Sequence, residues 1–323
     1  MTTYIKEYLN SLRDLNRPIY YYPNPGNGGD SIIAAATFQL LKECAVNYTI
    51  FPWQAIQNKL NTRSSEPSNL SQAIILYGGG GNLVNNYHGA ARKILEKYHD
   101  LVYKFVILPH TINTHEDLLA RLGSNVEIIC REEVSYKYVK AKALKANVLL
   151  MDDLGLSLNI EKLFQEKQLN YFSNSLKKIY YALMQDKRQY EFPSPKHLSS
   201  NDIDFFVKSF QKRLNTKEFE ELNCFRTDSE KTDFELPKDN IDLSLSICYG
   251  THNESVSYFT SRKIIEYIDL FHTVNTNRLH IAIPSALLGK RVRFFANNYY
   301  KCRAIYEYSL ESRFPNVEWI SNA

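Results

Sequence analysis

The chain has 323 residues, of which 44% are hydrophobic and 23% charged, a composition typical of a soluble globular enzyme. This length is sufficient for two compact domains, each with its own core. The formal net charge of +4 is small for a nucleic-acid-binding protein, whose basic residues normally form a stripe, so we expect no nucleic-acid partner.

Cysteine usage and hydropathy indicate the compartment. The five cysteines are scattered and form no C-x-x-C pair, which predicts reduced, packed thiols and no metal site. Residues 1–18 are amphipathic and lack the apolar core of a signal peptide. No apolar run approaches the length of a membrane span, so the sequence predicts a cytoplasmic protein.

The first half of the chain alternates β-rich runs with helical patterns. Strands are predicted at Pro18–Tyr22, Asn47–Phe51, Ala73–Tyr77, Leu101–Leu108, Val126–Cys130 and Val148–Met151. Helices are predicted at Ser31–Glu43, Ala90–His99 and Glu116–Leu122. Repeated β–α units with apolar strands are typical of a doubly wound, largely parallel sheet.

Residues 160–200 interrupt this alternation. Apolar side chains recur there at helical spacing among basic ones: Phe172, Leu176, Ile179 and Leu183. The pattern predicts a helical connector that either packs on a domain or rests on a membrane surface.

A second α/β region follows the connector. Strands are predicted at Leu222–Arg226, Asp242–Cys248, Asp269–Val274 and Arg291–Phe295. Helices are predicted at Ser255–Tyr267 and Thr276–Leu288, with a closing helix from Ala304 to Leu310. We therefore predict a GT-B-like α/β fold, in which two Rossmann-like domains, residues 1–158 and 216–323, are joined by the connector 159–215. Their parallel sheets would face a central cleft that binds the ligands.

Two glycine clusters follow strands of the first region. Gly26–Ser31 either brings a ligand close to backbone amides or forms a tight turn, with Asp30 or Ser31 capping the helix. A dinucleotide site is excluded by Ser31 at the third glycine position and by the lack of an acidic residue near Phe51. The run Gly78–Gly81 is entropically costly, which favours close contact with a ligand or with neighbouring backbone.

Charged residues follow two other strands. Arg131 comes directly after Val126–Cys130 and is predicted to point into the cleft; the alternative is a surface salt bridge with Glu132 or Glu133. Asp152-Asp153 ends the next strand, where one carboxylate caps a turn and the other is a candidate base.

The segment Thr276–His280 follows the strand Asp269–Val274. If Thr276 or Asn277 caps the next helix, Arg278 and His280 lie near its first turn, beside free amides and the positive end of the helix dipole. Such a site suits a small dianion, whereas the alternative is a packed histidine and a surface arginine.

Taken together, these segments resemble the polysaccharide pyruvyl transferase family. The resemblance rests on Gly26–Asp30, Gly78–Leu83, Pro109–Thr111, Arg131-Glu132 with Ser135, Asp152-Asp153 and Thr276–His280. It covers nearly the whole chain apart from Ile160–Ser200, and the tripeptide Arg278-Leu279-His280 is its most specific element. One departure is Leu154, because family members often have proline after the aspartate.

The resemblance implies transfer of a pyruvyl group from phosphoenolpyruvate to a sugar of a bacterial surface polysaccharide, with formation of a cyclic ketal and release of phosphate. It implies no cofactor, and it makes Arg131 and Arg278 donor-binding; the predicted catalytic residues are His280 and Arg278. Asp30 is a candidate base. The remaining predicted substrate-binding residues are Asn277, Gly28, Gly29, Gly80, Gly81, Asn82 and Lys301. We expect the acceptor on the N-terminal domain and the donor on the C-terminal one, with Arg131 reaching the donor across the cleft.

Two other functions stay open: a GT-B glycosyltransferase using a nucleotide-sugar, and a non-catalytic glycan-binding protein. The first would need a ribose-binding carboxylate, which is not evident after Thr276–Leu288. A lipid-linked acceptor and peripheral contact with the inner face of the cytoplasmic membrane are suggested by an excess of basic residues over Glu161–Gln189.

Overall fold

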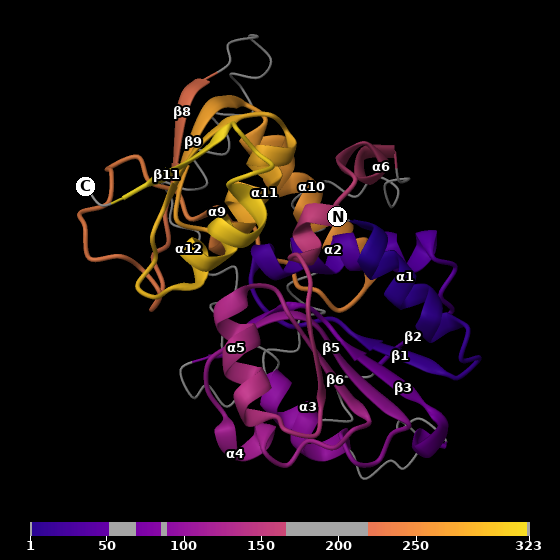
Figure 1. Ribbon diagram of the computed structural model, residues 1–323. Helices are drawn as coiled ribbons and strands as arrows, with labels where there is room; N and C mark the ends of the chain where they lie inside the picture. Colours follow the sequence, from indigo (N-terminus) through magenta and orange to yellow (C-terminus); the bar gives the residue numbers. More distant parts are fainter. Residues whose placement is uncertain (1, 52–68, 85–88, 166–218, 322–323) are drawn as a thin grey trace. The chain divides into compact units, whose positions relative to one another are not determined.

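The computed structural model describes residues 2–51, 69–84, 89–165 and 219–321. The chain divides into two compact units, and each is described here by itself (Figure 1). Unit 1 comprises Met1–Asn24 and Ala36–Ser157, and unit 2 comprises Pro25–Ala35 and Leu158–Ala323. The segment Pro25–Ala35 therefore groups with residues far along the chain, which the sequence did not indicate.

Unit 1 is built on a parallel sheet (Figure 1). Its strands are β1 (Ile19–Tyr22), β2 (Thr49–Ile50), β3 (Ile74–Tyr77), β4 (Gly80–Leu83), β5 (Lys104–Ile112), β6 (Val126–Cys130) and β7 (Asn147–Leu150). Their order is β2-β1-β3-β5-β6-β7, and β4 pairs with β5. All of these pairings are parallel. The predicted parallel sheet is thus confirmed for this unit.

Helices cover both faces of this sheet. They are α1 (Thr2–Arg13), α2 (Gly28–Glu43, which begins in unit 2), α3 (Ala90–Tyr98), α4 (Glu116–Leu119) and α5 (Glu133–Lys142), with short 3₁₀ turns η2 (Leu70–Gln72) and η3 (Leu154–Ser157). Residues of α3, α4 and α5 share one apolar core with Ile128 and Cys130 of β6 (Figure 1). Glu127 points to the opposite face, where it accepts a hydrogen bond from Tyr8 of α1.

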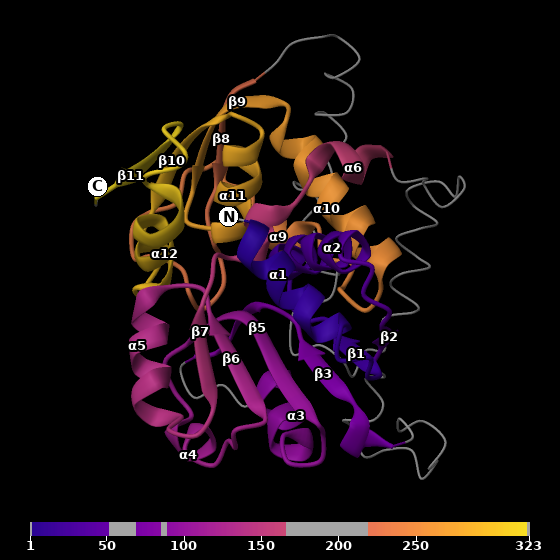
Figure 2. The same cartoon turned by 45° about the vertical axis from the view of Figure 1, so that its right-hand side comes forward.

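Unit 2 is a second parallel α/β unit. Its sheet has the order β11-β10-β9-β8, and every pairing is parallel (Figure 2). The strands are β8 (Phe219–Cys224), β9 (Phe271–Thr276), β10 (Arg291–Phe295) and β11 (Val317–Ile320). The helices are α6 (Ile160–Gln165), α9 (Leu243–Ser246), α10 (Glu254–Ile268), α11 (Leu279–Leu287), α12 (Lys301–Ile305) and the π-helical turn η5 (Tyr306–Leu310).

The structure corrects some local predictions. The strand predicted at Asp242–Cys248 is wrong: Leu243–Ser246 form the short helix α9. Asp242 is the N-cap residue of this helix, and its carboxylate binds Thr227 and Arg278. The run Gly78–Gly81 is more than a turn, since Gly80–Leu83 form β4. Strand β11 was not predicted.

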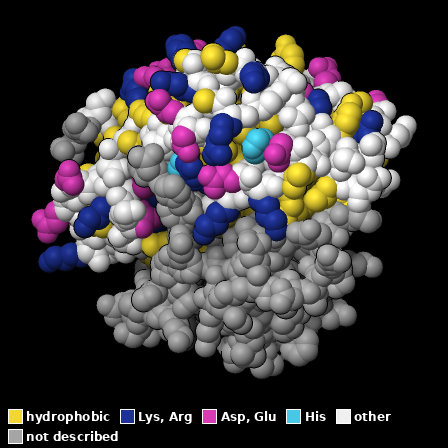
Figure 3. All heavy atoms as spheres, turned by 90° about the horizontal axis from the view of Figure 1, so that it is seen from below, with side chains coloured by type: hydrophobic (Ala, Val, Ile, Leu, Met, Phe, Trp, Pro, Cys, Tyr) yellow, Lys and Arg dark blue, Asp and Glu magenta, His cyan; other side chains and the backbone are white. Residues whose placement is uncertain are grey.

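Other predictions are confirmed or lie outside the described residues. All five cysteines are buried and free, as expected of packed thiols. Among the described helices, none combines the length and the apolar character needed to cross a bilayer. On the face seen in Figure 3, Lys and Arg side chains are interspersed with Asp and Glu. The connector predicted at 159–215 lies mostly outside the described residues, and the central cleft stays a prediction.

Candidate active site

In unit 2, cationic side chains extend from the carboxyl ends of neighbouring strands. Cys224 at the end of β8 is in register with Thr276 at the end of β9. Arg226 and Arg278 each lie two residues beyond these positions, at the same edge of the sheet. The carboxyl edge of a parallel sheet is where ligands of open α/β folds bind, so this edge is the candidate site of unit 2.

Arg278 is buried, with 3% of its surface exposed, and it is held by two carboxylates. Its Nε lies 2.8 Å from Asp242 Oδ1, and its Nη2 bonds Asp242 Oδ2. The same Nη2 lies 3.0 Å from Asp228 Oδ2. The two-point contact with Asp242 fixes the plane of the guanidinium, as expected of an arginine–carboxylate pair. The alternative of a surface arginine is therefore wrong.

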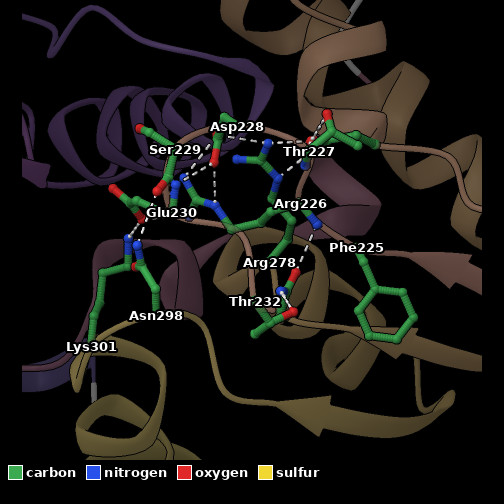
Figure 4. Close-up of polar contacts among 12 residues, drawn as sticks. Phe225, Arg226, Thr227, Asp228, Ser229, Glu230, Thr232, Arg278, Asn298 and Lys301 are labelled. Carbon is green, nitrogen blue, oxygen red and sulfur yellow. Dashed lines mark hydrogen bonds and ion pairs between the residues drawn. The ribbon is translucent and has the colours of Figure 1, made fainter. Parts of the chain in front are cut away.

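These contacts continue as a series of ion pairs, which Figure 4 shows in part. Arg226 Nη2 lies 3.0 Å from Asp228 Oδ2, and its Nη1 lies 2.8 Å from Glu230 Oε2. Lys301 Nζ lies 2.6 Å from the same Glu230 oxygen. We call the alternating series the ion-pair network. Its members, in order, are Asp242, Arg278, Asp228, Arg226, Glu230 and Lys301.

The network keeps its carboxylates ionised. Burial alone would raise the pKa of Asp228, but Arg278 and Arg226 hold that pKa well below its ordinary value. Burial would also raise the pKa of Glu230, but Lys301 and Arg226 lower it below its ordinary value. Burial would lower the pKa of Arg278, whereas Asp242 and Asp228 raise it. At neutral pH Asp228, Glu230 and Arg278 are therefore charged.

Polar backbone contacts fix the segment that carries Arg278. Thr276 Oγ1 accepts a hydrogen bond from the Arg278 amide at 2.9 Å and donates to the Cys224 carbonyl at 2.6 Å. Asn277 Oδ1 accepts from the Arg226 amide at 2.8 Å. Neither side chain caps α11, whose N-cap residue is Arg278, so the predicted capping role is wrong. Asn277 instead ties the end of β9 to the segment after β8.

His280 lies in the first turn of α11, beside the start of α2. A Cβ on Gly29 would lie 3.0 Å from the Cβ of His280 and 3.2 Å from its Nδ1. The α11 backbone is irregular at His280, with φ −86° and ψ 20°. The two segments predicted to supply Gly29 and His280 are thus brought together within unit 2, although the sequence placed them in different domains.

The glycines at the start of α2 have packing roles. A Cβ on Gly28 would lie 2.4 Å from the Ile247 carbonyl oxygen, and one on Gly26 would overlap the carboxylate of Asp30. Asp30 Oδ2 accepts a hydrogen bond from the Asn27 amide at 2.9 Å, which is the expected behaviour of a residue in the first helical turn. Ligand binding by Gly28 and Gly29 and catalysis by Asp30 stay predictions.

In unit 1, Arg131 forms a closed buried pair. Its Nη1 lies 2.7 Å from Asp153 Oδ2, and the two side chains are 2% and 1% exposed. Its Nε donates to Thr111 Oγ1 at 2.8 Å. Glu132, proposed as an alternative partner, instead caps α5 by accepting from the Ser135 amide. The surface salt bridge considered for Arg131 is therefore wrong.

A polar cluster lies near the second glycine run. Asn82 Nδ2 donates to Asn24 Oδ1 at 2.7 Å and to the Tyr77 hydroxyl at 3.0 Å. The backbone amide nitrogen of Asn82 lies 3.2 Å from Nε2 of His110. A Cβ on Gly80 would lie 2.3 Å from Asn24 Nδ2, so this glycine is required by the close approach of Asn24. Gly81 lies beside it in β4.

Burial changes the acid–base behaviour of this cluster. Desolvation and the nearby Arg131 guanidinium lower the pKa of His110 to about 3, against weaker opposing contributions from Gly78 and Asp153. His110 is therefore neutral at physiological pH. Neutral imidazole, amide and phenol groups suit the recognition of hydroxyls better than that of anions.

Sequence reasoning missed several members of these sites: Arg226, Asp228, Glu230, Asp242, Asn24 and Tyr77. Arg226 was assigned to the last position of the predicted strand Leu222–Arg226, although it follows β8 by the same offset as Arg278 follows β9. That shared offset is the signal that would have found it. Asp228 and Glu230 lie two and four residues beyond Arg226 and pair with it, so finding Arg226 would also have pointed to them.

Comparisons with known proteins identify the family of this chain. Residues 27–299 match the family model described as polysaccharide pyruvyl transferase. The chain is 26% identical over 334 residues to EpsO of Bacillus subtilis (strain 168), which is provisionally named a pyruvyl transferase; the match covers 99% of this chain and 94% of EpsO. A crystal structure of an uncharacterised protein from Klebsiella pneumoniae subsp. pneumoniae is similar with a TM-score of 0.73 and 27% identity, covering 100% of this chain and 99% of that one. The chain belongs to the polysaccharide pyruvyl transferase family.

Proposed function

We propose that this protein transfers the pyruvyl group of phosphoenolpyruvate to two hydroxyls of a sugar in a bacterial surface polysaccharide or its precursor, forming a cyclic ketal. The family supports pyruvyl transfer to a polysaccharide. The observation that carries the proposed donor chemistry is the position of buried Arg278, and of His280 two residues later, at the carboxyl edge of a parallel sheet.

The donor carries two anionic groups, a carboxylate and a phosphate. Arg278, Arg226 and Lys301 offer cations at one edge of unit 2, and guanidinium groups bind both kinds of anion at two points. In unit 1, Arg131 is the predicted further donor contact, although it already pairs with Asp153. The neutral cluster of Asn24, Tyr77, Asn82 and His110 supports placing the acceptor sugar on unit 1.

The reaction balances without a redox step. A proton from His280 adds to the methylene carbon of the donor, which becomes a methyl group. One sugar hydroxyl oxygen bonds to the adjacent carbon, and the bond from that carbon to the phosphate oxygen breaks. The second hydroxyl closes the ring, and the two hydroxyl protons replace the one lost from His280 and protonate the released phosphate. His280 suits this role because imidazole exchanges protons near neutral pH.

A base must receive the hydroxyl protons, and Asp30 is the proposed group. It lies in the first turn of α2, beside Gly29, whose Cα faces His280. Asp30 Oδ2 accepts a hydrogen bond from the Asn27 amide at 2.9 Å, which holds this carboxylate at the start of α2.

The test is phosphate release from phosphoenolpyruvate in the presence of candidate sugar acceptors, with mass spectrometry of the product. His280→Ala should lower kcat, because proton transfer matters only in the transition state. Arg278→Lys should chiefly raise KM for the donor, since it loses an anion contact present before reaction. Arg303→Ala, at a 45% exposed ion pair in the same unit, is the matched control and should change neither.

Two results would reject the proposal. Wild-type kinetics in both His280→Ala and Arg278→Lys would show that this edge of unit 2 is not the active site. Binding of a nucleotide-sugar without binding of phosphoenolpyruvate would favour a glycosyltransferase. Loss of the donor-induced rise in melting temperature in Arg131→Ala would support a donor contact by that residue.

We also propose that the acceptor is lipid-linked and meets the protein at the inner face of the cytoplasmic membrane. The support is the basic composition of Glu161–Gln189, whose part beyond residue 165 lies outside the described residues. Sedimentation with anionic vesicles at low and physiological salt tests this idea, and it fails if replacing Lys177 and Lys178 with Glu leaves pelleting unchanged.

A further inference from the structure

The ion-pair network is electrically balanced before any ligand binds. It contains three cations, Arg278, Arg226 and Lys301, and each lies against at least one of three carboxylates. A dianion added to this neutral set would meet as many negative charges as positive ones. For an anionic donor to bind here, some carboxylates have to leave the cations.

The three carboxylates differ in their exposure to solvent. The Asp242 side chain is 5% exposed, makes a two-point contact with Arg278, and also accepts a hydrogen bond from the Thr227 amide at 3.0 Å. The side chains of Asp228 and Glu230 are 26% and 20% exposed. Both lie on the loop after β8 (Figure 4).

A second observation points to a ligand at this edge. Asn297, two residues beyond the end of β10, is only 6% exposed, yet its Oδ1 and Nδ2 have no hydrogen-bond partner within the part of the chain that the structure describes. Buried amides are nearly always paired. The next residue, Asn298, donates to the Ser229 carbonyl at 2.9 Å, which places the Asn297 segment beside the loop of Asp228 and Glu230.

We propose that Arg226, Arg278 and Lys301 form one phosphate subsite, which the carboxylates of Asp228 and Glu230 occupy in the free protein. A phosphate dianion carries the same charge as the two carboxylates together, so the exchange keeps the network neutral. The loop that bears Asp228 and Glu230 moves outward when the phosphate enters, while Asp242 stays as the positioning residue of Arg278. The assignment of this phosphate to the donor rests on the proposed function.

The variants separate the two kinds of carboxylate. Asp228→Asn and Glu230→Gln remove an internal competitor and should tighten binding of inorganic phosphate by about fivefold each, the worth of a partly exposed ion pair. Asp242→Asn should weaken it, because Arg278 loses its orientation, and Arg226→Gln should weaken it through loss of a cation. Asp233→Asn, an exposed acid in the same unit, is the control for a general change in charge and should leave the affinity unchanged.

Isothermal titration with inorganic phosphate, and separately with phosphoenolpyruvate, gives the readout on full-length protein whose folding is checked by circular dichroism. Tightening in either loop variant, with none in Asp233→Asn, supports the subsite. Unchanged or weaker binding in both, or no phosphate binding at all, overturns it. If phosphate behaves as expected and phosphoenolpyruvate does not bind, the subsite stands and the proposed donor is wrong. If pyruvyl transfer occurs but the loop variants change neither ligand's affinity, the function stands and the subsite is wrong.

Discussion

Arg131 of unit 1 and Arg278 of unit 2 both follow the end of a buried parallel strand, but their surroundings differ. Arg131 pairs with Asp153 and donates to Thr111, and both side chains of the ion pair are almost fully enclosed. Arg278 has a buried partner, Asp242, and a partly exposed one, Asp228, from which ion pairs continue to Lys301. A closed pair has no exchangeable member, whereas an open network offers a ligand groups that it can replace.

This difference separates two uses of a buried cation. Breaking a closed pair leaves a charge without water or a partner, so the pair resists exchange and mainly orders its surroundings. In the network, Arg278 keeps Asp242 as a partner when Asp228 leaves. The geometry therefore favours Arg278 over Arg131 for binding an anion that comes and goes, and the predictions below test that contrast.

The largest expected effect is at the closed pair. Arg131→Met leaves Asp153 buried without its cation and should lower the free energy of unfolding of unit 1 by about 3–5 kcal/mol. The double variant with Asp153→Asn should recover part of this loss, because no buried charge then remains. Urea unfolding, with hydrogen exchange of unit 1 amides, measures both. Equal stability of Arg131→Met and wild type would contradict the closed-pair description.

In the network the corresponding change should cost less. Asp242→Asn removes one charge but leaves Arg278 paired with Asp228, and an amide oxygen can still accept from Thr227. We expect unit 2 to lose about 2 kcal/mol of unfolding free energy, the range of a hydrogen bond to a charged group. The same unfolding experiment applies, and a loss as large as that of Arg131→Met would remove the distinction between the sites.

The two regions should also respond differently to acid. His110 has a pKa of about 3 when folded and near 6.5 when unfolded, so only the unfolded state takes up its proton between these values. Stability is therefore lost as pH falls below about 6.5, by about 1.4 kcal/mol per pH unit. Asp228 and Glu230, whose pKa values are lowered, contribute stability that is lost only below their unfolded values of 3.8 and 4.5.

Unfolding free energies at pH 7 and pH 5.5 in wild type and His110→Gln isolate this contribution. The variant comparison is needed because burial also lowers the pKa of His252 in unit 2. The slope between these pH values should be shallower in His110→Gln. An identical slope would mean that His110 is protonated in the folded protein.

The smallest expected effect on stability comes from adding a methyl group beside His280. Gly29→Ala brings a Cβ within 3.0 Å of the His280 Cβ, so the histidine must shift by a few tenths of an ångström. The free energy of unfolding should fall by about 1 kcal/mol or less, whereas kcat should drop about tenfold because the proton donor is displaced. Gly123→Ala, whose Cβ would lie 2.9 Å from Asn125 Oδ1, is the matched change in unit 1 and should leave kcat unchanged. Equal loss of kcat in both variants would argue against a specific effect on the histidine.

Several features could be predicted from the sequence because they depend on neighbouring residues. The apolar run that forms β3 is continuous and that of β6 is interrupted only by Glu127, and such runs bounded by turns predict buried strands. The side chains that follow such strands, Arg131 and Arg278, could be assigned to a sheet edge for the same reason. The family resemblance, carried by short motifs in a fixed order, is confirmed by the match over residues 27–299.

Local patterns failed where distant partners decide the conformation. Asp242-Leu243-Ser244-Leu245 alternates as a strand would, yet Leu243 begins the helix α9, and the Asp242 side chain before it binds Arg278 and Thr227. Thr276 and Asn277 have side chains suited to capping, but both are engaged by residues at the end of β8. Propensity gives way in each case to a contact between strands that are far apart in sequence.

The sequence by itself determined the family, the parallel α/β class and the edges at which charged side chains follow strands. Only the tertiary structure decided which carboxylate meets each arginine: Asp153 rather than Glu132 for Arg131, and Asp242 with Asp228 for Arg278. It also placed Pro25–Ala35 in unit 2, where Gly29 meets His280. The physical reason is that secondary structure depends mainly on residues close together in the sequence. Ion pairs and close backbone contacts depend instead on which strands lie side by side in the sheet.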